Sequence, residues 1–186
     1  LRATTFEGLD QWLDERVDTR RVRPLRKEFG RQTYTADGNA LELSCEAGFQ
    51  AFVFDGCIAS AKFSAKVDLR GLGKCGIVFR VDPDSQDGYY LSLDLLKGVA
   101  QLRAWHTGAP ASGEKMMQFQ ALQSGNWHTD TPGKAELSLI AFGHYIELAV
   151  GGRVVLTLAN PTFTEGLFGV YLESAQMRLY EVELRK

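Results

Sequence analysis

From residue 40 to the end of the chain, apolar and polar side chains alternate with a period of two. The clearest example is the segment 58–68, whose apolar set is Ala59, Ala61, Phe63, Ala65 and Val67 and whose polar set is Ser60, Lys62, Ser64, Lys66 and Asp68. Successive side chains of a β-strand point to opposite sides of the sheet. The pattern therefore predicts a strand with one buried face and one solvated face.

Strand-like segments recur along this region, separated by turn residues such as Asp87-Gly88 and Gly151-Gly152. We expect strands at 41–46, 49–54, 58–68, 75–81, 88–95, 98–106, 115–121, 134–141, 144–150, 153–158, 166–173 and 176–185. Short strands without helical connections favour an all-β, antiparallel two-sheet β-sandwich of the jelly-roll, concanavalin A-like kind over βαβ units. A chain of 186 residues suits one such domain.

The first 37 residues are less regular than the rest. We expect residues 1–37 to form an irregular N-terminal segment packed on the sandwich, with one helical turn at 11–16. The chain begins with Leu1 and shows no signal-peptide pattern of a basic start and an apolar stretch. We interpret it as a domain of a longer or processed protein.

Composition and charge narrow the range of partners. The longest apolar runs are only strand-length, so no membrane span is predicted. The net charge is −2, which supplies no basic face for nucleic acid. One basic cluster lies among acidic neighbours and is interpreted as a solvated or internally paired face; it comprises Arg20, Arg21, Arg23, Arg26 and Lys27. We expect neither a membrane nor a nucleic acid as partner.

The segment 75–106 predicts a polar surface on three consecutive strands. If the apolar residues face the core, the other side of these strands carries Arg80, Tyr90, Ser92, Asp94, Gln101, Arg103 and Trp105. A carboxylate beside a guanidinium can bind the adjacent hydroxyl groups of a sugar, and Tyr90 or Trp105 can cover the apolar face of its ring. Two further strands add Glu46 and Glu173. The hypothesis requires Arg80 and Asp94 to emerge side by side.

Other interpretations of these residues stay open. Solvent-facing Arg and Asp on neighbouring strands are often simple ion pairs. The carboxylates Glu46, Asp94 and Glu173 can in principle act as the acid and base of a glycosidase. No nucleophile motif or clustered histidines accompany them.

A cation loop and a disulfide are the remaining candidates. The oxygen-bearing residues Asp82, Asp84, Gln86 and Asp87 resemble a calcium loop, but a plain turn is favoured because no EF-hand Glu follows. We therefore expect no cofactor, with a structural calcium as the alternative. The three cysteines, Cys45, Cys57 and Cys75, allow one disulfide at most, and Cys45 and Cys75 are expected to be buried thiols.

A family resemblance follows from three motifs. These are Gly76-Ile77-Val78-Phe79-Arg80, Asp87-Gly88-Tyr89-Tyr90-Leu91-Ser92-Leu93-Asp94, and the late Gly166-Leu167-Phe168-Gly169-Val170-Tyr171. Over residues 40–186 the chain resembles the concanavalin-like β-sandwich modules appended to bacterial glycoside hydrolases. It is most similar to the fructan (levan)-binding carbohydrate-binding modules of family 66.

The resemblance implies a small pocket that holds a terminal sugar through Arg80 and Asp94, with Glu46 as a weaker match. It implies a non-catalytic module of an extracellular, secreted glycoside hydrolase. Its partners would be a polysaccharide or oligosaccharide, with fructan favoured, and a tethered catalytic glycosidase domain. The alternatives are a structural sandwich that packs on a catalytic domain and a small sugar hydrolase, because one fold can host several functions.

Overall fold

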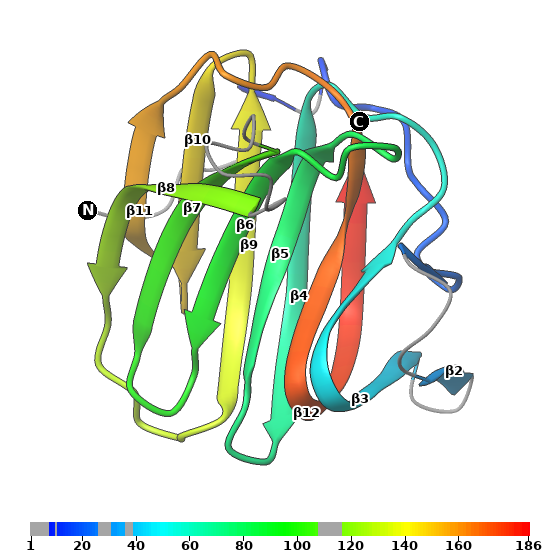
Figure 1. Ribbon diagram of the computed structural model, residues 1–186, viewed down its shortest axis with the longest axis vertical. Helices are drawn as coiled ribbons and strands as arrows, with labels where there is room; N and C mark the ends of the chain where they lie inside the picture. The colour runs from blue at the N-terminus through cyan, green and yellow to red at the C-terminus, as the bar shows by residue number, and fades with distance from the viewer. Residues whose placement is uncertain (1–7, 10, 26–30, 36–38, 108–116) are drawn as a thin grey trace, which may run out of the picture.

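The computed structural model describes residues 8–9, 11–25, 31–35, 39–107 and 117–186. These residues form twelve antiparallel strands (Figure 1). The strands are β1 (Arg23–Pro24), β2 (Arg31–Thr35), β3 (Ala40–Val53), β4 (Ala61–Arg70), β5 (Lys74–Val81), β6 (Gly88–Asp94), β7 (Val99–Thr107), β8 (Met117–Asn126), β9 (Lys134–Phe142), β10 (Tyr145–Val150), β11 (Arg153–Ala159) and β12 (Leu167–Arg185). The all-β, antiparallel class predicted from the alternation is confirmed.

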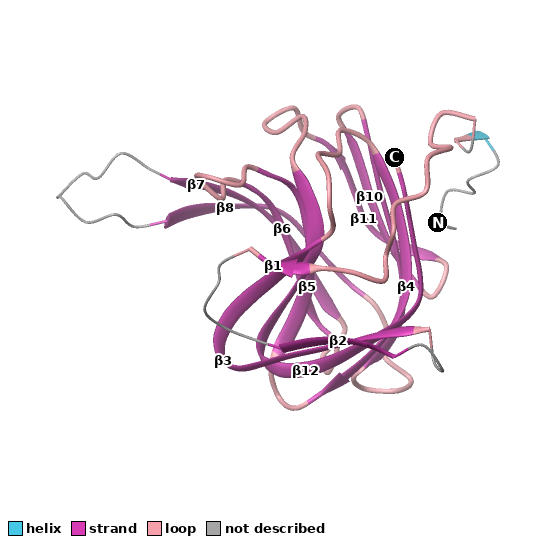
Figure 2. Ribbon diagram, turned by 90° about the vertical axis from the view of Figure 1, so that its right-hand side faces the viewer, coloured by secondary structure: helices cyan, strands magenta, loops and turns pink. Residues whose placement is uncertain are grey.

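The strands belong to one curled sheet in the order β11-β10-β9-β4-β12-β5-β6-β7-β8, with β3 also paired to β12. The first part of β12 pairs with β5, and its last part pairs with β4. Figure 2 shows β3 and β12 curving together between these two halves of the sheet. The separation into two sheets that the sequence predicts is therefore not confirmed, because two strands run through both halves.

A bulge allows the two long strands to bend. The register of β3 against β12 shifts between Glu173 and Ala175, where Gly48 and Ser174 both have positive φ angles of 72° and 47°. The thiol of Cys45 donates to the carbonyl of Ala47 at 3.3 Å and fastens the bulged segment. Extra residues in one strand of an antiparallel pair increase its bend and twist. The four predicted strands at 41–46, 49–54, 166–173 and 176–185 are therefore two continuous ones.

The main core lies between the two halves of the sheet. Phe79 and Tyr89 of one half are stacked with ring centroids 5.0 Å apart, and Phe168 lies 5.3 Å from Phe63 of the other half. All four side chains are at most 1% exposed. The apolar set of the segment 58–68 contributes Phe63 and Val67 to this core, as the period of two predicts.

The N-terminal segment differs from its prediction. The N–H groups of Trp12 and Leu13 both donate to the Leu9 carbonyl at 2.8 Å, so a single turn lies earlier than the helical turn predicted at 11–16. Arg16 makes an isolated bridge to Arg185 at the end of β12. Two short strands, β1 and β2, pair with β3 where irregular chain was expected. Within the described ranges, no helix is long and apolar enough to cross a membrane.

The cysteines and Arg20 of the basic cluster are placed as the sequence indicates, whereas Arg26 and Lys27 lie outside the described residues. Cys45 and Cys75 are buried, Cys57 is exposed, and all three are free thiols. In the basic cluster, Arg20 forms an ion pair with Asp18 at 2.9 Å. That guanidinium lowers the pKa of the Asp18 carboxyl well below its ordinary value of 3.8, mainly through the side-chain hydrogen bond. Arg20 is therefore internally paired.

Candidate functional site

Arg80 does not lie on the surface predicted for it. It has a positive φ of 53°, and the pairing of β5 with β12 shifts register beside it. This bulge turns its side chain to the core side, where it is 3% exposed. Nε donates to the Ala59 carbonyl at 2.9 Å, Nη1 to Phe163 at 3.0 Å and Nη2 to Gly143 at 2.6 Å. Burial lowers the pKa of this guanidinium.

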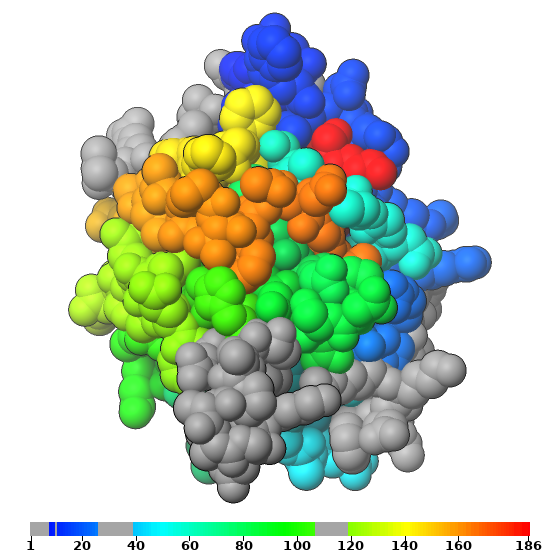
Figure 3. Space-filling model, turned by 45° about the horizontal axis from the view of Figure 1, so that its top comes forward, coloured from blue at the N-terminus to red at the C-terminus, as the bar shows by residue number. Residues whose placement is uncertain are grey.

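These three carbonyls belong to segments far apart in the sequence. Figure 3 looks onto this end of the molecule, where the loop after β11 (orange) lies beside the loop that follows β5 (green). The Arg80 guanidinium thus links three segments and supplies the hydrogen-bond donors that their backbone carbonyls require. Its role is structural, and the expectation that it faces solvent is wrong.

Asp94 lies at the other end of the sheet. It is six residues beyond Gly88, which follows the loop after Arg80, so the two are separated by roughly 20 Å of strand at about 3.3 Å per residue. Its Oδ1 accepts hydrogen bonds from the backbone of Leu96 at 3.2 Å and Lys97 at 3.0 Å. The carboxylate closes the β6–β7 turn, a common use of Asp. The predicted pair of Arg80 and Asp94 therefore does not form.

Four of the remaining predicted residues share the outer side of β12, β6 and β7: Tyr90, Arg103, Trp105 and Glu173. Four aromatic side chains gather there and define what we call the aromatic face: Phe49, Tyr90, Trp105 and Tyr171. The ring of Phe49 has centroid distances of 4.8 Å to Tyr171 and 6.1 Å to both Tyr90 and Trp105. Tyr90 and Trp105 meet edge to face at 4.5 Å. Such tilted and edge-to-face arrangements are favourable for aromatic pairs.

Gly76 of β5 makes room for this cluster. A Cβ on Gly76 would lie 2.0 Å from Cε1 of Tyr171 and 2.1 Å from the carbonyl oxygen of Leu91. The Tyr171 ring therefore crosses β5 in contact with its backbone and reaches Ser92 on β6, with which it hydrogen-bonds. Burial raises the pKa of the Tyr171 hydroxyl above its ordinary value. A side chain at position 76 would displace this ring.

Polar side chains border the aromatic face. Nε of Arg103 donates to Oε1 of Gln101 at 2.6 Å, and its guanidinium lies 4.7 Å from the centroid of the exposed Phe119 ring. Glu173 stands opposite Phe49 in the strand register, at the far edge of the cluster. Arg103 and Glu173 are partly exposed, so each retains hydrogen-bonding groups that face solvent.

Trp105 carries a buried donor without an acceptor. Its Nε1 is shielded from solvent, and no hydrogen-bond partner for it occurs in the described part of the chain. Buried polar groups are normally paired, and an orphaned one points to a missing ligand or water. Tyr90, by contrast, donates its hydroxyl to the carbonyl of Gln86 at 2.7 Å and is 3% exposed. Trp105 is therefore the aromatic residue of this face whose polar atom has unmet hydrogen-bonding capacity, and a ligand would have to displace the groups that cover Nε1 to use it.

Glu46 lies apart from this cluster. It is exposed on the bulged part of β3 and lines an open pocket of about 380 Å³ together with Ser44, Arg70 and Gln176. None of these residues belongs to the aromatic face. Of the seven predicted ligand-binding residues, the structure brings together Tyr90, Arg103, Trp105 and Glu173, and it separates Arg80, Asp94 and Glu46 from them.

The proposed cation loop makes an ordinary turn. Oδ1 of Asp82 accepts the backbone N–H groups of Asp84 at 2.9 Å and Ser85 at 2.7 Å. These bonds lower the pKa of the Asp82 carboxyl, the bond from Ser85 most strongly. Among the residues that the structure describes, no group of three or more His, Cys, Asp or Glu side chains is placed to hold a metal ion.

Comparison with known proteins places the fold. No family model matches the sequence, and no curated protein matches it. Among solved structures, the chain is similar to the carbohydrate-binding module CBM66 from Bacillus subtilis, with a TM-score of 0.70 and 17% identity over 89% of this chain and 95% of that one. The expected resemblance to family 66 is therefore confirmed at the level of the fold.

Two further solved structures share the architecture. A Bacillus subtilis protein of unknown function with a galectin-like fold has a TM-score of 0.65 and 14% identity, over 89% of this chain and 88% of that one. A putative glycosyl hydrolase from Parabacteroides distasonis has a TM-score of 0.58 and 8% identity, over 83% and 82% of the two chains. At these identities the similarity establishes the fold alone.

Sequence reasoning missed two parts of the site. Phe49 follows Gly48 and reads as the start of a new strand, whereas the bulge places its ring over the aromatic cluster. Gly76 gives no periodic signal because it has no side chain. A glycine inside a strand is nevertheless a recognised sign of close approach by another group, and that signal was present in the motif 76–80.

Proposed function

We propose that this chain is a non-catalytic carbohydrate-binding module and that the aromatic face is its sugar-binding surface. The observation that carries the proposal is the orphaned Nε1 of Trp105, which lies within a cluster of aromatic rings bordered by Gln101 and Arg103. The similarity of the fold to that of a carbohydrate-binding module supports the same assignment.

The aromatic face suits the chemistry of a sugar ring. One side of a pyranose or furanose ring presents C–H groups, which pack on aromatic surfaces, while its rim presents hydroxyl groups. The indole N–H of Trp105 can donate to a hydroxyl oxygen. The Arg103 guanidinium adds donors, and Gln101 and Glu173 add acceptors, so both roles of a hydroxyl are met.

The proposal extends to the wider setting implied by the family resemblance. The polysaccharide would be a fructan, the module would work outside the cell, and a catalytic glycosidase domain would be tethered to it. Binding to a shallow surface engages few groups, so we expect modest affinity for a single sugar chain.

The three tryptophans of the chain allow a direct test by NMR of their indole N–H signals. Trp105 lies on the aromatic face, while Trp12 is 66% exposed on the N-terminal segment. Each signal is assigned with a Trp→Phe variant. Titration of the labelled chain with fructo-oligosaccharides should shift the Trp105 signal and leave that of Trp12 unchanged.

Matched arginine variants measure the contribution of the polar border. Arg103→Gln should weaken the affinity for the oligosaccharide about 10-fold, the effect of losing about 1.4 kcal/mol of charge-assisted bonding. Arg178→Gln is the control, because Arg178 is ion-paired with Glu42 elsewhere in the sheet. An unmoved Trp105 signal with fructo-, gluco- and galacto-oligosaccharides alike would refute the sugar-binding surface.

A structural accessory domain is the second candidate function, favoured by the apolar side chains left exposed on the isolated chain. Phe119, which stands opposite Trp105 in the strand register, is 54% exposed, and Phe49, whose ring lies 6.1 Å from that of Trp105, is 37% exposed. Exposed apolar side chains that form a patch can mark an interface with another domain. This candidate predicts that Phe119→Ser improves the solubility of the isolated chain while no oligosaccharide binds.

A further inference from the structure

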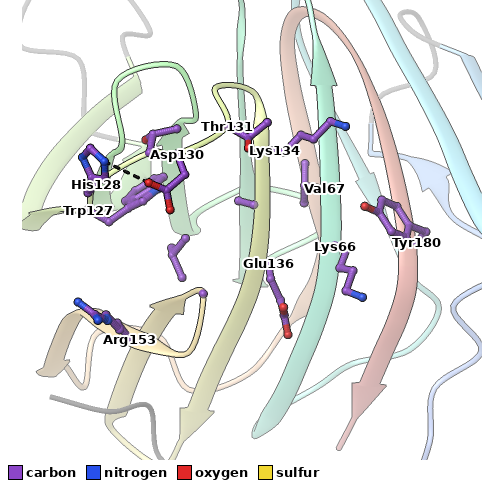
Figure 4. Close-up of a pocket in the computed structure, with 14 residues that line it drawn as sticks. Lys66, Val67, Trp127, His128, Asp130, Thr131, Lys134, Glu136, Arg153 and Tyr180 are labelled. Atoms are coloured by element: carbon purple, nitrogen blue, oxygen red, sulfur yellow. Dashed lines mark ion pairs between the residues drawn. The ribbon is translucent and has the colours of Figure 1, made fainter.

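A second pocket, remote from the aromatic face, opens at the end of the sheet where β9 begins (Figure 4). Its volume is about 610 Å³. Three elements form it: the loop between β8 and β9, the β10–β11 hairpin, and the outer side of β9, β4 and β12. The side chains used in the argument are Lys66, Trp127, His128, Asp130 and Glu136, all of which line the pocket.

The charges around this pocket are largely paired. His128 Nε2 lies 3.1 Å from Oδ1 of Asp130, and Lys66 Nζ lies 2.7 Å from Oε2 of Glu181. Glu136 stands opposite Lys66 in the register of β9 and β4. The carboxylates of Glu181 and Glu136 both raise the pKa of Lys66, and the hydrogen bond that Lys66 donates to Glu181 has the largest effect. Two of the three lysine and arginine side chains that line the pocket, Lys66 and Lys134, thus have carboxylate neighbours, so most of its positive charge is already balanced.

The same pairs are well arranged for hydroxyl groups. A carboxylate next to a cation presents an acceptor and a donor side by side, which matches two adjacent hydroxyl groups of a sugar. Trp127 is partly exposed in the pocket and packs its inner edge against the main core, so its position is fixed. An aromatic ring held in this way is a platform for the C–H side of a sugar ring.

The hydroxyl group of Thr129 in the pocket has no hydrogen-bond partner among the described residues. Oγ1 of Thr129 is buried without a hydrogen bond among the described residues, and Thr129 itself lines the pocket. A Cβ on Gly98 would lie only 2.6 Å from this oxygen, so Thr129 is pressed against the β6–β7 turn. The loop that carries Trp127 is thus held rigidly, by this contact and by the bond from Trp127 N to the Gly98 carbonyl at 2.9 Å.

We propose that this pocket is a second binding site, for a neutral saccharide. Trp127 would carry the ring, and Asp130, beside the His128 ring, and Glu136, opposite Lys66, would bind the hydroxyl groups. The inference does not require the aromatic face to bind sugar, since the two places share no residue. If both bind, one chain can hold two glycan segments at once, which raises its avidity for a polysaccharide.

The indole signals again provide the test, now with Trp127 as the reporter. Titration of the full chain with fructo-, gluco- and galacto-oligosaccharides should shift the Trp127 signal with at least one of them, and the shift should persist at 0.5 M NaCl. The double variant Asp130→Asn/Glu136→Gln should weaken this binding at least 10-fold. Both side chains are exposed, so the fold should survive the change.

Asp55→Asn provides the matched control. Its side chain is 87% exposed and lies 4.0 Å from Arg23, away from the pocket, so it should leave the Trp127 titration unchanged. Three results would each overturn the second site: no Trp127 shift with any neutral oligosaccharide, equal shifts in the double variant, or shifts with sulfated oligosaccharides alone. A shift of Trp127 without one of Trp105 would support this pocket while refuting the aromatic face.

Discussion

The outer sides of the two halves of the sheet follow the same alternation and have opposite characters. On β4 the outward residues include Lys66 and Asp68, which are partly exposed and lie near Glu181 and Lys134 in ion pairs. On β5 and β6 the outward positions instead include Val78 and Tyr90, which are buried in a second apolar cluster. Period-two alternation therefore identifies which residues share a side, but not whether that side is solvated.

The difference has a physical origin in the partners that each side meets. Charged side chains on a solvated strand keep their hydration and gain little from pairing. Aromatic rings on the aromatic face are held by one another and by the backbone at Gly76, so their positions are fixed before any ligand arrives. Preorganised groups lose less entropy on binding, which is why we assign the sugar-binding surface to that side.

The largest effect is expected when an arginine buried inside the fold is removed and the result is compared with removal of an arginine on the aromatic face. Arg80→Ala should destabilise the fold by about 4 kcal/mol, because a buried side chain is removed and three backbone carbonyls lose their charged donor at once. Arg103→Ala, on the aromatic face, should cost about 1 kcal/mol. Urea unfolding curves measure both. Equal losses from the two variants would contradict the structural role of Arg80.

Gly76 tests whether the aromatic face depends on close packing against the backbone of β5. Gly76→Ala should destabilise the fold by about 2 kcal/mol, since the new methyl group collides with the Tyr171 ring and with the Leu91 carbonyl. It should also abolish the Trp105 response to oligosaccharide, because the aromatic cluster is displaced. Gly8→Ala is the control, because a Cβ on Gly8 would meet no atom within 4 Å and its backbone is outside the left-handed region. A fully stable Gly76→Ala variant would show that the ring does not cross β5.

The cysteines compare a buried and an exposed site in the same chain. Burial raises the pKa of the Cys75 thiol from 9.0 to about 12. Between pH 9 and pH 12 the unfolded chain loses the thiol proton while the folded chain keeps it. The contribution of the buried Cys75 thiol to the free energy of unfolding is therefore complete below pH 9 and is lost as the pH rises. The loss approaches about 1.4 kcal/mol per pH unit.

Urea unfolding of wild type and Cys75→Ala between pH 8 and 11 measures this term. The difference in stability between the two proteins should narrow across that range, whereas Cys57→Ala, at an exposed position, should track wild type. Parallel pH profiles for all three proteins would contradict the burial of Cys75.

Much of the fold follows from the sequence because burial imposes the alternation directly. The strands between 58 and 106 lie within a few residues of their predicted bounds, since each carries a regular apolar set. The bulges were not predictable in the same way. At Ala47-Gly48 and at Ser174 the sequence looks like a turn, and only the pairing of β3 with β12 shows that both strands continue.

Part of the candidate site could be predicted, because alternation gives the side on which a residue lies wherever the strand has no bulge. Alternation placed Tyr90, Arg103, Trp105 and Glu173 on one side correctly, because β6 and β7 pair without a shift and β12 keeps its register with β3 up to Glu173. It misplaced Arg80, whose positive φ reverses the direction of its side chain. A single bulged residue changes sides without any change in the sequence period.

Asp94 gives the smallest predicted effect and the cleanest separation of the turn from the binding surface. Asp94→Ala should cost about 1 kcal/mol, because Oδ1 no longer accepts the N–H groups of Leu96 and Lys97 at an exposed turn. The Trp105 titration with fructo-oligosaccharides should be unchanged, since the carboxylate is occupied by the turn. Asp94→Asn retains an acceptor and should recover most of the lost stability. A large loss of sugar affinity in both variants would instead return Asp94 to the binding surface and extend that surface along β6 to its end.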